Sequence, residues 1–231
     1  MSEMTSAEPE TEPGSLPATL RLVARLVSPR RRGRIADALR ERRLRTVDAL
    51  DLLAEETLLK LARHSLWLLA GSGVAFAGLS VVARVAHGSG PLLGAGSPAL
   101  RGAVLVLANA ASYAGMLPIH EGLHAAAMLA LGGRPRFGLK LPLAAYCTAP
   151  GQLFTRNGYL AIAAAPLVVL TVAGAVITWL APDLGACILF GLAGNVSGAV
   201  GDLWAIARIR RLPSSALLED TATGFTVYAV P

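Results

Sequence analysis

Charge is scarce along most of this chain. Only 16% of its 231 residues are charged, whereas 54% are hydrophobic; an average soluble domain has about 25% charged residues. Between residues 63 and 211 the only carboxylates are Glu121, Asp183 and Asp202. Twelve of the 21 basic residues lie at or before Arg63. This distribution is typical of a protein dissolved in lipid that carries a soluble N-terminal extension.

The signatures of several other protein classes are also missing. The two cysteines, Cys147 and Cys187, have no metal-ligand spacing and provide no disulfide framework. The first sixteen residues are acidic and contain prolines, rather than being basic and then apolar, so we expect no cleavable signal peptide. The net charge is +6. The arginines, however, lie beside apolar segments without interleaved aromatics, so we expect no nucleic-acid partner.

What the chain has instead is four apolar segments. They cover residues 65–83, 103–131, 159–181 and 186–207, and Pro118 interrupts the second. Each approaches or exceeds the roughly 20 residues needed to cross a hydrocarbon layer about 30 Å thick. Soluble core helices are usually shorter and apolar on one side only. The sequence therefore predicts an all-α membrane protein with about four transmembrane helices.

The N-terminal extension divides into two parts. Residues 1–18 are polar, acidic and proline-rich, which predicts a disordered tail. Residues 19–62 predict one or two basic amphipathic cytoplasmic helices, broken near Pro29. Such helices could lie on anionic lipid or could be a solvated linker, and both interpretations stay open. The apolar residues at roughly helical spacing are Ile35, Leu39, Val47, Leu50 and Leu58.

The basic residues also predict the orientation. With the N-terminus in the cytoplasm, nineteen of the 21 basic residues lie on the cytoplasmic side, as the positive-inside rule requires. We therefore expect both termini in the cytoplasm. The loop 132–157 has short β-compatible pieces and three prolines, which predicts a small β-hairpin-like cytoplasmic loop. The tail after Pro213 contains GFTVYAV, a candidate short strand to which we assign no chemistry.

The second apolar segment contains a motif that carries chemistry. Residues 120–124 read His-Glu-Gly-Leu-His, and on a helix the two histidines are about 40° and ~6 Å apart. Both imidazoles can therefore reach one zinc ion, and Glu121 is placed to take a proton from water that the metal activates. Polar groups at membrane depth are costly, at roughly 2.5–3.5 kcal/mol for a central Asp. The motif therefore predicts a zinc site inside the membrane.

A catalytic zinc site needs a third protein ligand. His64 and His87 flank the first segment at opposite faces of the membrane, and Asp183 lies in a short turn. None of the three is therefore well placed to be the third zinc ligand. Asp202, in the fourth segment, lies at a depth similar to that of His124. On a helical wheel it shares an arc of about 120° with Asn195 and four glycines. Such glycines permit close helix packing; they are Gly191, Gly194, Gly198 and Gly201.

With these motifs the chain resembles the site-2 protease class of intramembrane zinc metalloproteases. It resembles most closely a bacterial family of unknown function described as "putative zincin peptidase". The first motif of the class, H-E-x-x-H, matches His120 to His124 completely. The second, Asn-x-x-Pro-x-x-x-Leu-Asp-Gly in the third core helix, is matched only in part by Asn195 and Asp202. The two residues are seven positions apart rather than eight, the proline is missing, and Gly-Asp-Leu replaces Leu-Asp-Gly. The similarity extends over about residues 103–230. It includes an Arg-x-x-Tyr pattern from Arg156 to Tyr159 that is followed by apolar residues up to Pro166.

The resemblance implies a role for each site residue. His120, His124 and Asp202 would bind zinc, Glu121 would be the general base, and Asn195 would hydrogen-bond the substrate backbone. A three-helix metalloprotease core of about residues 103–211 would lie within a transmembrane domain of residues 63–231, with the first apolar segment as an addition.

The resemblance also implies an activity. The expected protein is a zinc-dependent intramembrane endopeptidase of the bacterial cytoplasmic membrane. It would cleave membrane-embedded or membrane-associated proteins, and the 137–155 loop would offer an edge strand to an unfolded substrate segment.

Two other functions remain open from the residues. A catalytically inactive membrane metal-binding or scaffold protein of the same fold would keep the zinc ligands. It would not, however, need a general base such as Glu121. A transporter with an intramembrane metal site is less favoured, since four apolar segments without a visible inverted repeat are unlike most transporters.

Overall fold

The computed structural model describes residues 20–23, 25, 27–41, 43–94, 96–140 and 144–230. The tail predicted to be disordered, residues 1–18, lies outside them. The helices are α1 (Pro29–Arg40), α2 (Glu55–Ala86), α3 (Pro98–Leu131), α4 (Arg156–Leu180), α5 (Pro182–Cys187), α6 (Leu189–Gly198) and α7 (Val200–Ile209). The strands are β1 (Arg21–Leu22), β2 (Arg45–Asp51), β3 (Arg136–Lys140), β4 (Ala144–Thr148), β5 (Gln152–Thr155), β6 (Leu217–Thr221) and β7 (Gly224–Ala229).

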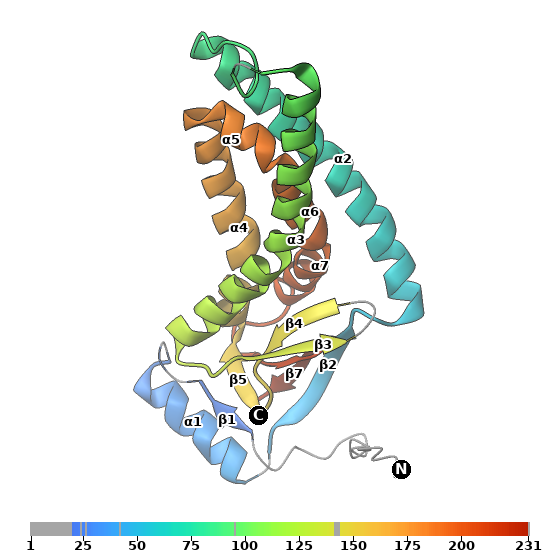
Figure 1. Ribbon diagram of the computed structural model, residues 1–231. Helices are drawn as coiled ribbons and strands as arrows, with labels where there is room; N and C mark the ends of the chain where they lie inside the picture. Colours follow the sequence, from blue (N-terminus) through green and yellow to red (C-terminus); the bar gives the residue numbers. More distant parts are fainter. Residues whose placement is uncertain are drawn as a thin grey trace, which may run out of the picture.

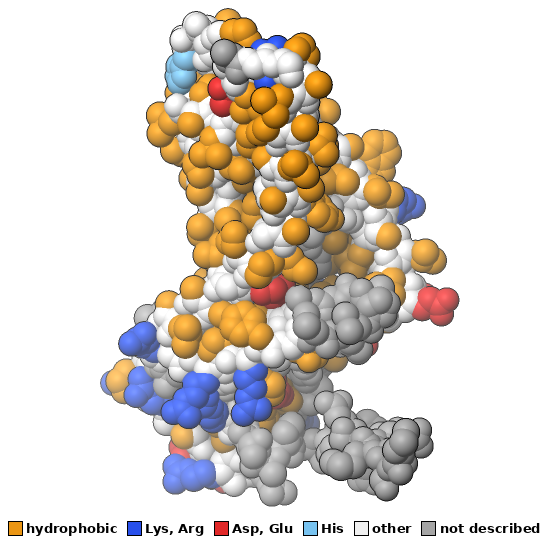
Figure 2. Space-filling view, viewed as in Figure 1, with side chains coloured by type: hydrophobic (Ala, Val, Ile, Leu, Met, Phe, Trp, Pro, Cys, Tyr) orange, Lys and Arg blue, Asp and Glu red, His pale blue; other side chains and the backbone are white. Residues whose placement is uncertain are grey.

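Among the described residues, four helical spans are long and apolar enough to cross a membrane: α2, α3, α4 and the consecutive pair α6–α7. Large apolar side chains on them are turned outward, for example Trp67, Leu107 and Leu180, which are 75%, 70% and 70% exposed. In Figure 2 hydrophobic side chains dominate the surface of the helical bundle, and Lys and Arg gather mainly at the end that carries the sheets. The expectation of four apolar helical spans is confirmed.

The spans differ from the expected ones in their length and in where they are interrupted. Helix α2 has 32 residues and is therefore about 48 Å long, which exceeds the roughly 30 Å of a hydrocarbon layer. Helix α3 continues through Pro118 and changes direction along its length in Figure 1, as helices do at prolines. The fourth span is divided into α6 and α7 at Ala199. This break lies between Asn195 and Asp202.

The sheets correct the expectation of an all-α protein. Besides the expected hairpin of β3 and β4, a five-stranded sheet has the order β1-β5-β6-β7-β2, and it lies at one end of the helical bundle (Figure 1). Strands β1 and β5 are parallel, and the other pairs are antiparallel. The candidate strand in the C-terminal tail is confirmed as β7. A side chain at Gly224, where β7 begins, would meet the Leu50 carbonyl of β2 at 1.9 Å.

The segment 19–62 is only partly helical, which is a second correction. A helix does begin at Pro29, and it buries Ile35. Val47 and Leu50, however, lie on strand β2. Their spacing resembled that of a helix, but pairing with β7, far away in the sequence, determines their conformation. Secondary structure that depends on such distant pairing overrides a weak local pattern.

The five-stranded sheet is covered on both faces. One apolar cluster joins it to α1 and includes Ile35 and Leu217. The other joins it to the ends of the membrane helices and includes Met128, Ile162 and Leu218. Consecutive residues of β6 thus point to opposite faces, as the pleat of a strand requires. The sheet is therefore packed directly against the helix ends that carry the polar residues described next.

One ion pair also joins the sheet to the membrane helices. Arg208 of α7 donates to both carboxylate oxygens of Asp48 on β2, at 2.8 and 2.5 Å. The guanidinium holds the pKa of the Asp48 carboxyl below its usual value. Because the pair is partly exposed, its contribution to stability is modest, but its two-point geometry fixes the orientation of β2 relative to α7.

Candidate metal centre

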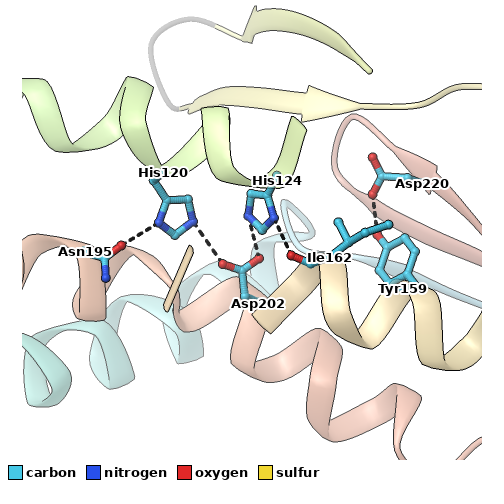
Figure 3. Close-up of polar contacts among 7 residues, drawn as sticks. All are labelled: His120, His124, Tyr159, Ile162, Asn195, Asp202 and Asp220. Carbon is cyan, nitrogen blue, oxygen red and sulfur yellow. Dashed lines mark hydrogen bonds and ion pairs between the residues drawn. The ribbon is translucent and has the colours of Figure 1, made fainter. Parts of the chain in front are cut away.

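His120 and His124 lie one turn apart on α3 and face the interior of the bundle. Their side chains are buried, with residue exposures of 8% and 9%, and their ring centroids are 5.0 Å apart. This is the arrangement that a spacing of four residues on a helix predicts. The two imidazoles therefore lie side by side in one buried region next to α4, α6 and α7 (Figure 3).

Asp202 on α7 completes the group. Its Oδ2 lies 3.1 Å from Nε2 of His120, and its Oδ1 lies 3.3 Å from Nε2 of His124. All three ligand atoms lie within 4.8 Å of one another. Within the described part of the chain, this is the one group of His, Cys, Asp or Glu side chains with such spacing. The structure thus brings together the three residues that the sequence singled out as zinc ligands.

The second nitrogen of each imidazole has its own partner. Nδ1 of His124 lies 3.0 Å from the Ile162 carbonyl of α4, and Nδ1 of His120 lies 2.9 Å from Oδ1 of Asn195. A carbonyl can only accept a hydrogen bond, so Nδ1 of His124 carries the proton. The same assignment suits His120. Both Nε2 atoms then present lone pairs toward Asp202, which is the tautomer that a metal ligand needs.

Close packing of α6 against α3 brings Asn195 to His120. A side chain at Gly191 would meet the Ser112 carbonyl at 2.8 Å, and one at Gly194 would meet the Tyr113 ring at 2.8 Å. The predicted glycine-mediated approach of the fourth span to the second is therefore present at these two positions. At Gly198 nothing lies within 4 Å. Gly191 and Gly194 of α6 are thus in close contact with α3, whereas Gly198 is next to open space.

Glu121 lies beside this centre at the wall of a cavity of about 370 Å³. The cavity is also lined by His124, Asp202, strand β4, the start of α2 and the turn between β6 and β7. The backbone of Cys147 on β4 lies near the Glu121 carboxylate. Glu121 is therefore next to both the three ligand atoms and the hairpin, in a space that could admit part of a substrate.

Two residues beside the centre were missed by the sequence reasoning. The Tyr159 hydroxyl of α4 donates to Oδ1 of Asp220 on β6, and both side chains are buried and line the same cavity. Burial raises the pKa of the Asp220 carboxyl to about 6, and burial, with Glu121 nearby, raises the pKa of the Cys147 thiol to about 12. Only the Arg-x-x-Tyr pattern pointed toward Tyr159. Asp220 lies in the tail to which no chemistry was assigned.

The other polar residues considered as ligands lie elsewhere. His64 bonds through Nδ1 to the Lys60 carbonyl at 2.6 Å. The ring of His87 packs on the edge of Trp179. Asp183, in α5 rather than in the expected turn, forms an ion pair with Arg84 of α2. None of these three belongs to the metal-binding group.

The donor set fits zinc. Zinc prefers four tetrahedral ligands at about 2.0–2.1 Å for His nitrogen and 2.0–2.2 Å for carboxylate oxygen, so neighbouring ligand atoms should be about 3.3 Å apart. Nε2 of His120 and Nε2 of His124 each lie at about this distance from one of the two Asp202 oxygens, 3.1 Å from Oδ2 and 3.3 Å from Oδ1. Two neutral imidazoles and one carboxylate are a common ligand set of catalytic zinc, which leaves a fourth position for water or substrate. His120, His124 and Asp202 would hold the ion.

Comparison with known proteins agrees with this geometry. Residues 113–217 match a family model described as "Putative zincin peptidase". The expected resemblance to this family is confirmed, and the resemblance to the site-2 protease class stays a prediction. The matched segment includes Glu121, Asn195 and all three candidate ligand residues, but ends before Asp220. No curated protein and no solved structure matches the chain.

Proposed function

We propose that the protein is a zinc-dependent intramembrane endopeptidase that hydrolyses peptide bonds of membrane-embedded or membrane-associated proteins. The observation that carries the proposal is the convergence of two histidine Nε2 atoms on Asp202, beside Glu121 in one cavity. The zincin peptidase family match supports the peptidase class, and the four apolar helices support the location in a membrane.

Each residue of the site has its own role in the proposed hydrolysis. A bound zinc ion would polarise the peptide carbonyl and lower the pKa of water toward about 7. Glu121 accepts the proton as the water oxygen bonds to the peptide carbon, and then returns it to the nitrogen as the carbon–nitrogen bond breaks. Asp202 and the two imidazoles hold their lone pairs toward one point. Asn195 keeps His120 oriented, and its Nδ2 is buried with no partner among the described residues. Asn195 is not among the residues that line the cavity, so a hydrogen bond from this amide to the substrate stays a prediction.

Strand β4 is the candidate docking element for substrate. One edge pairs with β3, and no other described strand pairs with it. Cys147 of β4 lies beside Glu121 at the cavity. An extended segment that added to this strand would bring its backbone to Glu121, whereas a helical peptide bond would be shielded. The substrate is therefore a membrane protein or peptide that is unwound near the cleavage position.

The basic residues support an orientation for this protease. Strands β1 and β7 belong to one sheet, so both ends of the described chain lie on the same side of the helical bundle. The N-terminal extension brings twelve basic residues to that side. By the positive-inside rule this side faces the cytoplasm, and a bacterial cytoplasmic membrane is the proposed location.

Replacement of Glu121 by Gln tests the proposal. The protein would be reconstituted in liposomes with a library of single-span peptides, and the products would be identified by mass spectrometry. Wild type should produce fragments cut within or next to the apolar segment. Glu121→Gln should retain zinc and lose at least about 100-fold in rate, since Gln cannot accept the proton. Cleavage by neither protein, with zinc bound to both, would favour the inactive metal-binding alternative. Equal cleavage by the two proteins would contradict the role of Glu121 as general base.

A further inference from the structure

A chain of contacts connects the cytoplasmic sheet to the metal centre. Asp220 on β6 accepts the Tyr159 hydroxyl. Tyr159 lies three residues before Ile162 and therefore on the same side of α4, about one turn away. The Ile162 carbonyl in turn accepts Nδ1–H of His124, at 3.0 Å. Figure 3 shows these side chains in sequence, from Asp220 to Asp202.

Asp220 also contacts the hairpin. Its backbone carbonyl accepts the hydroxyl of Thr148, the last residue of β4, at 3.2 Å. Oδ2 of its carboxylate is buried without a hydrogen-bond partner among the described residues. One residue of β6 therefore holds both the first turn of α4 and the end of β4. These are the elements that orient His124 and contact Glu121.

The buried carboxyl of Asp220 does not favour folding at neutral pH. Its pKa rises from 3.8 to about 6 mainly because the carboxyl is buried, while the hydrogen bond from Tyr159 and the charge of His124 act in the opposite direction. The Cys147 thiol of β4 is the other titratable group that interacts with it. Between these two values the folded chain binds more protons than the unfolded chain, so the free energy of unfolding falls as pH rises. Asp220→Asn should therefore unfold at a higher temperature than wild type at pH 8, and the difference should narrow at pH 5.

We propose that Asp220 is a positioning residue of the metal centre. Through Tyr159 it fixes the start of α4, and with it the Ile162 carbonyl that holds His124 in the metal-binding tautomer. The inference rests on the zinc site of the proposed function. It extends that function because a residue of the five-stranded sheet then helps to orient the zinc ligand His124.

The chain offers a matched control next to Asp220. Glu219 accepts a hydrogen bond from the Tyr228 hydroxyl at 2.8 Å, so the two pairs have the same chemistry. Tyr228, however, belongs to the apolar cluster that joins the sheet to α1, on the face of the sheet away from the metal centre. Tyr159→Phe and Tyr228→Phe each remove one hydroxyl from a tyrosine–carboxylate pair, and only the first pair is connected to His124.

The test uses the protein in detergent. Zinc affinity is measured by competition with a chromophoric chelator, and the unfolding temperature is measured by thermal denaturation. Tyr159→Phe and Asp220→Ala should each weaken zinc binding about tenfold, the lower end of the range for outer-shell partners. The double variant should lose no more than either single variant, since both remove one contact. Asp220→Asn should keep near-normal affinity because its amide oxygen can still accept the Tyr159 hydroxyl. Tyr228→Phe should bind zinc normally, whatever its unfolding temperature.

Wild-type affinity in Tyr159→Phe, or an equal loss in Tyr159→Phe and Tyr228→Phe, would overturn the inference while leaving the proposed zinc site intact. Failure of wild type itself to bind zinc would overturn both. If Asp220→Ala does not fold, the comparison of the two Tyr→Phe variants decides the question alone.

Discussion

At the scale of single residues, both nitrogens of each histidine are in use. Nε2 faces Asp202 and Nδ1 faces a carbonyl oxygen, from Ile162 for His124 and from Asn195 for His120. The sequence alone could indicate His120, His124 and Glu121 because their spacing on a helix is fixed by local geometry. It could not indicate Ile162, whose contribution is a backbone carbonyl, since any residue type supplies one.

Three variants distinguish a zinc ligand from a residue that only orients a ligand, with one of them as the control. Asp202→Asn should lose most zinc affinity, since a neutral amide is a poorer ligand than a carboxylate. Asn195→Ala should weaken zinc binding about 10- to 100-fold through the released His120 ring. Asp183→Asn, which alters only the pair with Arg84, is the control and should bind normally. Zinc titrations of the purified variants check this. Full affinity in Asp202→Asn would mean that another group completes the metal site.

At the scale of secondary-structure elements, the packing of α6 on α3 determines how near Asn195 and Asp202 come to the histidines. Asn109 of α3 reinforces it, donating to the Ala186 carbonyl and accepting the Phe190 N–H, at 2.9 and 2.8 Å. The break at Ala199 then turns α7, so that residues on both sides of it reach His120. A straight-helix wheel placed Asn195 and Asp202 on one face but could not show this break.

A pair of glycine substitutions tests this packing. Gly191→Ala should destabilise the protein by about 1–3 kcal/mol, because the new methyl group would overlap the Ser112 carbonyl of α3. Gly198→Ala, where nothing lies within 4 Å, should be neutral or slightly stabilising. Thermal unfolding in detergent compares the two. Equal stability of both variants would show that the α3–α6 contact is looser than the structure indicates.

The elements also show why some of the fold was predictable. Long apolar runs identify membrane helices because the hydrocarbon layer imposes length and composition on each span separately. The five-stranded sheet has no such local signal. Its strands come from the N-terminal extension, the loop before α4 and the C-terminal tail, and β2 carried an apolar spacing that also suits a helix. Only their pairing with one another determines that they are strands.

At the scale of the whole molecule, the sheet covers the end of the bundle where the cavity lies. The turn between β6 and β7 and the start of α2 line the same space as Glu121. The predicted orientation places this end in the cytoplasm and the α2–α3 connection outside. Substrate would therefore meet the cavity from the cytoplasmic half of the membrane.

Cysteine labelling tests this orientation. On a background without Cys147 and Cys187, a cysteine at Ser89 should react with a membrane-impermeant maleimide in intact cells. A cysteine at Ser215 should react only after the cells are opened. Both positions are exposed, so accessibility depends on the side of the membrane. The reverse pattern would place the cavity outside the cell and contradict the proposed topology.

The central claim is that His120, His124 and Asp202 together hold one zinc ion. The most direct measurement is the zinc content of the full-length protein, purified in detergent without chelators and analysed by mass spectrometry of the metal. We predict about one zinc per chain in wild type and near zero in the double variant His120→Ala/His124→Ala. A wild-type chain without zinc, or a double variant that retains it, would contradict the account.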